Sequence, residues 1–218
     1  MLAVIAIDGP AGAGKSTVAK LVAEATGLPY LDTGAMYRCV ALLSTRTGID
    51  SSNESGVAAI AESIDITFKG VQCWMNGEDV SQEIRSAEIA SIVSIIAAQS
   101  PVRTAMRTQQ QRWIQQQGGG VVEGRDIGTV VFPNAELKVF LTASPEERAS
   151  RRVDQSGGDL KEIAFNIAER DRIDSERVDS PLRPASDAVM VDSTGLSITE
   201  VVDVIVDHFT HSLEKRHG

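Results

Sequence analysis

The sequence predicts an α/β protein built on a five-stranded parallel sheet with flanking helices. Short apolar runs alternate along the chain with stretches of helical periodicity, which is the pattern of a sheet built from strand, crossover helix and strand. The runs are short and apolar throughout, as strands buried on both faces should be. The length of 218 residues, with 42% hydrophobic and 23% charged residues, allows one packed domain or a core with a small insert.

The elements follow in order along the chain. Strands are predicted at residues 3–8, 29–32, 121–123, 137–142 and 188–192. One helix ends at Gly27, another begins at Thr33, and two more span about 86–99 and 101–117, the last ending in three glycines before the third strand. Ser144 and Ser197 each begin a helix, with Glu147 and Glu200 three residues on as partners in a capping box. The final helix carries an apolar stripe of Val201, Val204, Ile205 and Phe209.

Two segments depart from this alternation. Residues 64–85 contain short strand-like runs with turns at Lys69-Gly70 and Asn76-Gly77, the second a type I′ hairpin signal, so we expect a small antiparallel insert. Residues 148–165 are polar and contain Gly157-Gly158, which favours a mobile flap over a packed pair of helices.

Composition excludes several classes of protein. The net charge of −9 gives no long-range attraction to phosphodiester backbones, so we expect no nucleic-acid partner. Cys39 and Cys73 are far apart in sequence and form no C-x-x-C motif, so neither a zinc site nor a disulfide framework is indicated. The apolar run at the amino terminus is too short for a signal peptide, and no run approaches 18 apolar residues; we therefore expect a cytoplasmic protein without membrane association.

A phosphate-binding motif follows the first strand. Residues 9–16, GPAGAGKS, match G-x-x-x-x-G-K-[ST] and lie between a predicted strand and a predicted helix, as the motif requires. Its glycines let successive backbone N–H groups turn toward phosphates, Lys15 reaches the β and γ phosphates, and the Ser16 hydroxyl can ligate Mg²⁺. The predicted ATP-binding residues are Gly9, Pro10, Ala11, Gly12, Ala13, Gly14, Lys15, Ser16 and Thr17.

Arginine indicates the kind of phosphoryl acceptor. The chain has fifteen arginines and six lysines, and eleven of the arginines lie between Arg103 and Arg183. An alcohol acceptor needs a carboxylate base, whereas a phosphate acceptor is already mostly ionised and needs arginine forks to hold it. The arginines therefore favour a nucleoside monophosphate or similar acceptor. The alternative for any one of them is a solvated ion pair, as in the run Glu169-Arg170-Asp171-Arg172.

Five segments together resemble the bacterial cytidylate kinases, P-loop nucleoside monophosphate kinases that phosphorylate CMP and dCMP with ATP. They are IDGPAGAGKST (7–17), LDTGAMYR (31–38), NGEDVSQEIR (76–85), VEGRDIGTVVFP (122–133) and RDRIDSERVDSPLRPASDA (170–188), in the order of the family. The first is shared by many P-loop kinases, whereas GRDIGT and R-D-x-x-D-S-x-R are specific.

The resemblance implies how the chain is divided. Residues 1–32 and 106–218 would form the core P-loop domain, residues 33–105 an insert that binds the monophosphate, and residues 148–165 a lid over the donor phosphates. It also implies a monomer.

The resemblance further implies which residues bind the acceptor. Arg38, Arg125 and Arg177 are expected to hold its phosphate, beside Thr33. Arg170 and Asp174 are expected at the sugar. Ser94, Arg103 and Asp126 are expected to read cytosine, whose N4 amino group donates to a carboxylate while N3 and O2 accept. The predicted catalytic residues are Lys15, Arg125, Arg177 and Arg152, the last representing a lid in which Arg148 and Arg151 are alternatives.

Two other functions remain open. A P-loop kinase of a metabolite alcohol is disfavoured because no base motif is evident, and a switch ATPase would hydrolyse ATP without an acceptor. A guanine-specific GTPase is excluded because no Asn-Lys-x-Asp sequence occurs. His208, His211 and His217 lie in or beyond the last helix without other ligands, so no metal site is expected there, and Trp74 and Trp113 are expected to pack.

Overall fold

The computed structural model describes residues 2–217, without the side chains of Ser156, Arg216 and His217. Met1 and Gly218, the outermost residues of the predicted core domain, lie outside this range. The chain divides into two compact units. The first unit comprises Met1–Leu31 and Ile114–Gly218, and the second comprises Asp32–Trp113.

The sheet of the first unit has the order β2-β6-β1-β7-β8. Its strands are β1 (Ala3–Asp8), β2 (Tyr30–Asp32), β6 (Gly119–Gly124), β7 (Leu137–Thr142) and β8 (Val189–Asp192). β1 runs parallel to both of its neighbours, and its last residue, Asp8, lies opposite Gly124 of β6 and Phe140 of β7. The predicted five-stranded parallel sheet is confirmed. Because β1 is central, the residues that follow it emerge at the middle of the carboxyl edge, where open α/β sheets bind their ligands.

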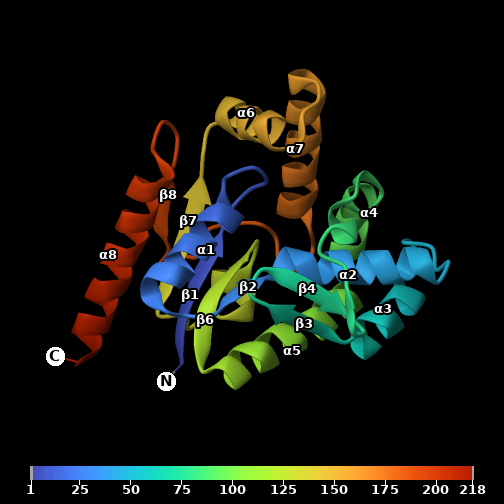
Figure 1. The fold of residues 1–218 in the computed structure, drawn as a ribbon, viewed down its shortest axis with the longest axis horizontal. Coiled ribbons are helices and arrows are strands. Elements are labelled where there is room, and N and C mark those ends of the chain that lie inside the picture. Colours follow the sequence, from blue (N-terminus) through green and yellow to red (C-terminus); the bar gives the residue numbers. More distant parts are fainter. Residues whose placement is uncertain (1, 218) are drawn as a thin grey trace. The chain divides into compact units, whose positions relative to one another are not determined.

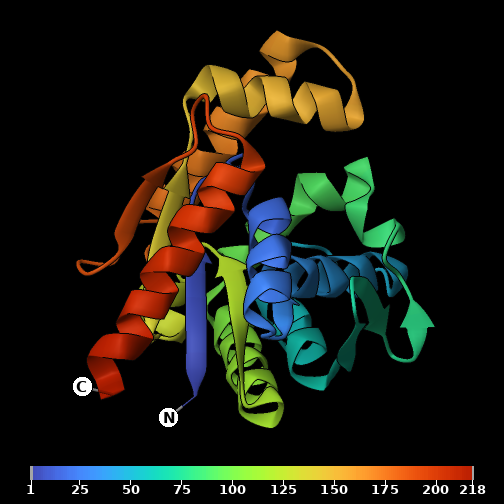
Figure 2. The same ribbon diagram turned by 60° about the vertical axis from the view of Figure 1, so that its left-hand side comes forward.

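Two helices pack together on this sheet (Figures 1 and 2). α1 (Lys15–Thr26) and α8 (Ile198–His217) contact each other and bury Val18, Val22, Ile205 and Phe209 against strand residues such as Ile5 and Leu141. The Ser197 capping box is present, with the Glu200 N–H donating to Ser197 Oγ and the Ser197 N–H to Glu200 Oε2. In the predicted apolar stripe of α8, Val204 is exposed and Val202 is buried instead. The buried face of α8 is therefore rotated by part of a turn from the predicted face.

The expectation of a flap at residues 148–165 was wrong. These residues belong to α6 (Pro145–Ser156) and α7 (Leu160–Glu176), which pack against each other. Ser144 Oγ accepts the Glu147 N–H, but the Ser144 N–H donates to Thr194 Oγ1, so only half of the predicted capping box forms. At the start of α7, Asp159 Oδ1 accepts two N–H groups. Gly157 and Gly158 have positive φ and make the turn between the helices. The polar composition reflects the exposed faces of two capped helices.

A second correction concerns the glycines before β6. Gly119 and Gly120 were expected to lie beyond the end of a helix, but they form the first two residues of the strand. A Cβ at Gly119, where φ is 143°, would lie 2.5 Å from the Ala3 carbonyl oxygen. Glycine is therefore required there by the close approach of β1 and not only by the preceding turn.

The second unit is mainly helical, with a three-stranded antiparallel sheet of order β3-β4-β5. Its elements are α2 (Thr33–Arg46), α3 (Glu54–Ser63), β3 (Ile66–Lys69), β4 (Gln72–Met75), β5 (Glu78–Asp79), the short 3₁₀ turn η1 (Glu83–Arg85), α4 (Ala87–Ala97) and α5 (Ser100–Gln117), which contains the unit boundary. The antiparallel insert is confirmed. Asn76 and Gly77 have φ of 50° and 82°, as a type I′ turn requires.

The two cysteines meet in this second unit. Cys39 of α2 and Cys73 of β4 are buried free thiols whose sulfur atoms lie 3.4 Å apart. Their separation in the sequence concealed this contact.

No single helix among residues 2–217 is long and apolar enough to cross a membrane, although Ala87–Ala97 and Ser100–Gln117, bent by 99°, pass as a pair on length and composition alone.

Candidate functional site

The loop that follows β1 has the shape that its sequence predicts. Gly9, Gly12 and Gly14 have φ of 153°, 76° and 86°, and a Cβ on Gly9 would lie 2.0 Å from the Leu141 carbonyl oxygen. The loop therefore turns tightly against β7 and leads into α1 at Lys15. Free backbone N–H groups at a helix N-terminus attract anions, and glycine allows them to point the same way.

Lys15 is buried at the base of this loop, where its Nζ donates a hydrogen bond to the Pro10 carbonyl oxygen at 2.8 Å. Burial, together with Arg125 and Arg170, lowers the pKa of Lys15 to about 7, although Glu123 and Asp8 oppose this shift. Both guanidinium groups are therefore close enough to Lys15 to disfavour its charged form. Such crowding of like charge is relieved when an anion binds among them.

The adjoining Ser16 points to the neighbouring strand. Its hydroxyl donates to Glu123 Oε2 at 2.9 Å, and the other oxygen of Glu123 accepts from the Tyr30 hydroxyl. Glu123 is buried in β6, one residue before the position opposite Asp8. A hydroxyl and a carboxylate side by side are hard oxygen donors, which suit Mg²⁺.

An arginine cluster lies beyond β6 in the first unit. Arg125 Nε donates to Asp174 Oδ2 at 2.7 Å, and Arg177 Nε donates to the Asp174 carbonyl oxygen at 3.2 Å. Burial alone raises the pKa of Asp174, but Arg125, Arg177 and Arg170 outweigh it and hold that pKa below its usual value. Arg170, Asp174 and Arg177 are four and three residues apart, so they share one face of α7 and its C-terminal end.

Asp8 holds the segment that carries Asp126. Its two carboxylate oxygens accept the N–H groups of Ile127 and Gly128 at 2.8 and 2.7 Å. These residues begin η2 (Ile127–Val131), a short π-helical turn of the kind found at functional sites. Burial raises the pKa of Asp8 to about 6, with a smaller contribution from Asp126.

The comparisons with known proteins decide the family. The sequence profile of the family described as cytidylate kinase matches residues 5–211. The chain belongs to this family.

Relatives with this name match most of the chain. The cytidylate kinase of Geobacter sp. is 47% identical over 211 residues, which cover 93% of this chain and 90% of that protein. The cytidylate kinase of Pelotomaculum thermopropionicum is 46% identical over 212 residues and 93% of each chain. The bifunctional pantoate ligase/cytidylate kinase of Prochlorococcus marinus is 50% identical over 217 residues, but the chain spans only 44% of its length.

Solved structures show the same fold at low identity. An uncharacterized protein from Eubacterium ventriosum superposes with a TM-score of 0.58 at 12% identity, covering 97% of this chain and 99% of that one. A gluconokinase from Sinorhizobium meliloti has a TM-score of 0.55 at 15% identity, covering 99% and 95%.

The residues that the cytidylate kinase resemblance selects fall into two groups. In the first unit, Arg125, Asp174 and Arg177 are in direct contact, Arg170 acts electrostatically on both Asp174 and Lys15, and Asp126 is buried beside Asp8. Arg152 lies exposed on α6.

The second group lies in the second unit. Thr33 is the buried first residue of α2, Arg38 Nη1 donates to the Ile84 carbonyl oxygen at 3.3 Å, and Arg103 is buried with Nη1 donating to the Ala97 carbonyl oxygen at 3.0 Å. Ser94 lies half-buried on α4. Their roles in binding the acceptor stay predictions.

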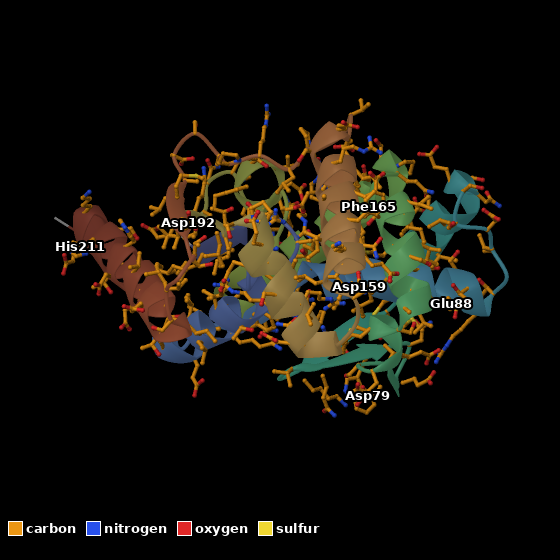
Figure 3. All side chains as sticks on the ribbon, turned by 90° about the horizontal axis from the view of Figure 1, so that it is seen from above. Asp79, Glu88, Asp159, Phe165, Asp192 and His211 are labelled. Atoms are coloured by element: carbon orange, nitrogen blue, oxygen red, sulfur yellow. The ribbon has the colours of Figure 1, made fainter. Side chains whose placement is uncertain are left out.

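The sequence reasoning missed Asp8, Tyr30 and Asp171. Asp8 could have been found, because a carboxylate that ends a buried apolar strand needs hydrogen-bond partners. Asp171 was interpreted as part of a solvated charge run, but that description fits Glu169 and Arg172, which form an exposed ion pair with each other. His208 and His211 are exposed on α8, where His211 is labelled in Figure 3, and residues 2–217 contain no group of three or more His, Cys, Asp or Glu that could hold a metal.

Proposed function

We propose that this chain transfers the γ-phosphoryl group of ATP to CMP or dCMP, giving ADP and CDP or dCDP. The observation that carries the proposal is the closeness of Arg125 and Arg170 to the buried Lys15. The two arginines lower the pKa of Lys15, and the three groups together favour binding of a multiply charged anion beside the P-loop. The names of the cytidylate kinase relatives support the choice of acceptor.

The P-loop residues 9–17 would bind the ATP phosphates. Backbone N–H groups of the loop would face the phosphate oxygens. Lys15 Nζ would keep its hydrogen bond to the Pro10 carbonyl oxygen and direct its two other donors to the transferring group. Ser16, supported by Glu123, would hold Mg²⁺, which neutralises charge on the β and γ phosphates when bound. Arg152 is our choice among the α6 arginines for contact with the transferred phosphoryl.

The arginines would hold the acceptor. Arg125 and Arg177, with Arg38, would bind the CMP phosphate, which is already ionised near neutral pH and needs no catalytic base. The Asp174 carboxylate would accept hydrogen bonds from the sugar hydroxyls, and Arg170 would donate to the sugar oxygens. Asp126 would accept a hydrogen bond from the cytosine N4 amino group. Ser94 and Arg103 would donate hydrogen bonds to cytosine N3 and O2.

A kinase of an alcohol or a switch ATPase is not favoured, because the cluster beside the P-loop offers guanidinium groups in place of a free carboxylate base. We further propose a cytoplasmic enzyme that acts as a monomer on small-molecule substrates, without nucleic acid or membrane.

The test is ADP release from Mg-ATP with CMP, dCMP, UMP and AMP offered separately. We expect a large rise with CMP and dCMP over a low background. ADP release that is equally fast with and without an acceptor would indicate a switch ATPase. Absence of any rise with every monophosphate would overturn the proposal.

A further inference from the structure

Ala11, at the third position of the P-loop, is held from both sides by a partly buried ion pair. Asp171 Oδ1 of α7 accepts the Ala11 N–H at 2.8 Å, and Arg148 Nη1 of α6 donates to the Ala11 carbonyl oxygen at 3.0 Å. The two side chains are paired with each other and are 18% and 11% exposed. α6 also packs against the loop directly, since a Cβ on Gly12 would lie 3.0 Å from the Arg148 carbonyl oxygen.

The same peptide group also binds Lys15. The Pro10 carbonyl oxygen accepts from Lys15 Nζ at 2.8 Å, and the Ala11 N–H on the other side of that peptide donates to Asp171. A peptide group is planar, and in its trans form the carbonyl and the N–H point in opposite directions. The hydrogen bond to Asp171 therefore sets the direction of the carbonyl that Lys15 contacts.

The loop needs such an external constraint. Gly9 and Gly12 flank the Pro10–Ala11 peptide with φ of 153° and 76°, a region in which glycine moves with little steric resistance. The ion pair also differs from its neighbours on α7. Arg172 is 54% exposed and pairs with Glu169 and Glu176 on the same helix, away from the P-loop.

We propose that Asp171, supported by Arg148, is a positioning residue that orients the Pro10–Ala11 peptide and through it holds Lys15 in place for the phosphates of ATP. This inference rests on the proposed function, because it takes ATP as the ligand that Lys15 binds. It predicts a selective loss of nucleotide binding and not of acceptor binding.

The experiment compares Asp171→Leu with Asp171→Asn. Both remove the negative charge opposite Arg148, but only asparagine keeps an oxygen that can accept the Ala11 N–H. Glu169→Gln is the matched control, because it removes an ion-paired carboxylate two residues away on α7 that does not contact the P-loop. The measurements are the Kd of ADP by calorimetry, the KM values of ATP and CMP, and the unfolding temperature.

We expect Asp171→Leu to raise the Kd of ADP and the KM of ATP about tenfold, as befits loss of a hydrogen bond to a charged group, with the KM of CMP unchanged. Asp171→Asn should recover most of this loss, and Glu169→Gln should match the wild type. Equal effects of Leu and Asn, or an equal rise of both KM values, would overturn the proposal.

A double-mutant cycle tests whether Asp171 acts through Lys15. In a Lys15→Met background Asp171→Leu should weaken ADP binding much less than in the wild type, because the group that it positions is gone. An undiminished effect would show that Asp171 acts elsewhere. If Asp171→Leu leaves Arg148 too costly to bury and does not fold, Arg148→Leu/Asp171→Leu removes both charges and enters the same cycle.

The two proposals fail differently. A wild type that binds ADP but shows no CMP-dependent ADP release would end the proposed function, and the ADP-binding cycle would still decide the role of Asp171.

Discussion

Arg125 Nε donates to Asp174 Oδ2 at 2.7 Å, so the residue that follows β6 is joined to the last turn of α7. Arg177 also contacts Asp174, and all of these side chains are buried or nearly so. One carboxylate thus orients two guanidinium groups while neutralising only one of their two positive charges. The arrangement is suited to holding the phosphate of an acceptor.

Replacing Arg177 with alanine should impair use of CMP far more than binding of ATP. We expect the KM of CMP to rise at least about tenfold, as for loss of one charge-assisted phosphate contact, with the Kd of ADP nearly unchanged. Initial rates and calorimetry measure the two effects. An equal loss of both would remove Arg177 from the acceptor site, and the unfolding temperature controls for loss of its contacts with Asp174.

Replacing Asp126 with asparagine should weaken discrimination between CMP and UMP. The asparagine amide can donate to the uracil O4, which the carboxylate repels, so the ratio of kcat/KM values should fall about tenfold. Competition between the two monophosphates measures this ratio. An unchanged ratio would refute a base-reading role for Asp126.

Binding of ADP near pH 8 should be accompanied by proton uptake at Lys15. Burial, with Arg125 and Arg170, lowers the pKa of Lys15 to about 7, so the free lysine is mostly neutral at pH 8, and a polyphosphate favours its charged form. Calorimetry in buffers of different ionisation enthalpy counts the protons. Proton uptake should decrease toward pH 6, where Lys15 is already charged, and it should be absent in Lys15→Ala. The rate of phosphoryl transfer should also fall at least about a hundredfold in Lys15→Ala. Equal uptake in Lys15→Ala would contradict the assignment.

Asp8 should make the protein less stable as pH rises through its pKa. Burial raises the pKa of Asp8 from 3.8 to about 6, so the folded state binds its proton more tightly than the unfolded state does. The resulting stabilisation is complete below pH 3.8 and is lost as pH rises through 6, on the order of 3 kcal/mol in the free energy of unfolding.

Urea unfolding of the wild type and Asp8→Asn between pH 4 and 7 isolates this effect, because the two proteins share every other titrating group. The wild type should lose stability relative to Asp8→Asn over this range. A difference that stays flat or grows with pH would contradict the prediction.

Gly119→Ala should destabilise the first unit more than Gly118→Ala. Both glycines have positive φ, but a Cβ at Gly119 meets the Ala3 carbonyl oxygen at 2.5 Å, whereas a Cβ at Gly118 meets nothing within 4 Å. The steric contact should add about 2 kcal/mol to the backbone strain common to both. Chemical denaturation measures the difference, and equal losses would show that β1 and β6 separate easily.

Local signals in the sequence were sufficient to predict most of the helices, strands and turns of this protein. The apolar runs determined which segments are strands, the serine caps where α6 and α8 begin, and Asn76-Gly77 the hairpin, because each depends on residues within a few positions of one another. The motif at 9–16 predicted the phosphate-binding loop for the same reason. The polar segment at 148–165 misled because capped, exposed helices and mobile loops have similar composition.

Tertiary structure decided which charges act together. Asp171 lies 160 residues from Ala11, and Asp174 lies 49 residues from Arg125. Nothing in the local sequence separates Asp171, which is hydrogen-bonded to the P-loop, from Arg172, which is exposed to solvent. The contact of Cys39 with Cys73 and the need for glycine at position 119 likewise arise from pairing of distant segments. Short-range patterns determine the elements, but burial and pKa depend on what the rest of the chain packs around each side chain.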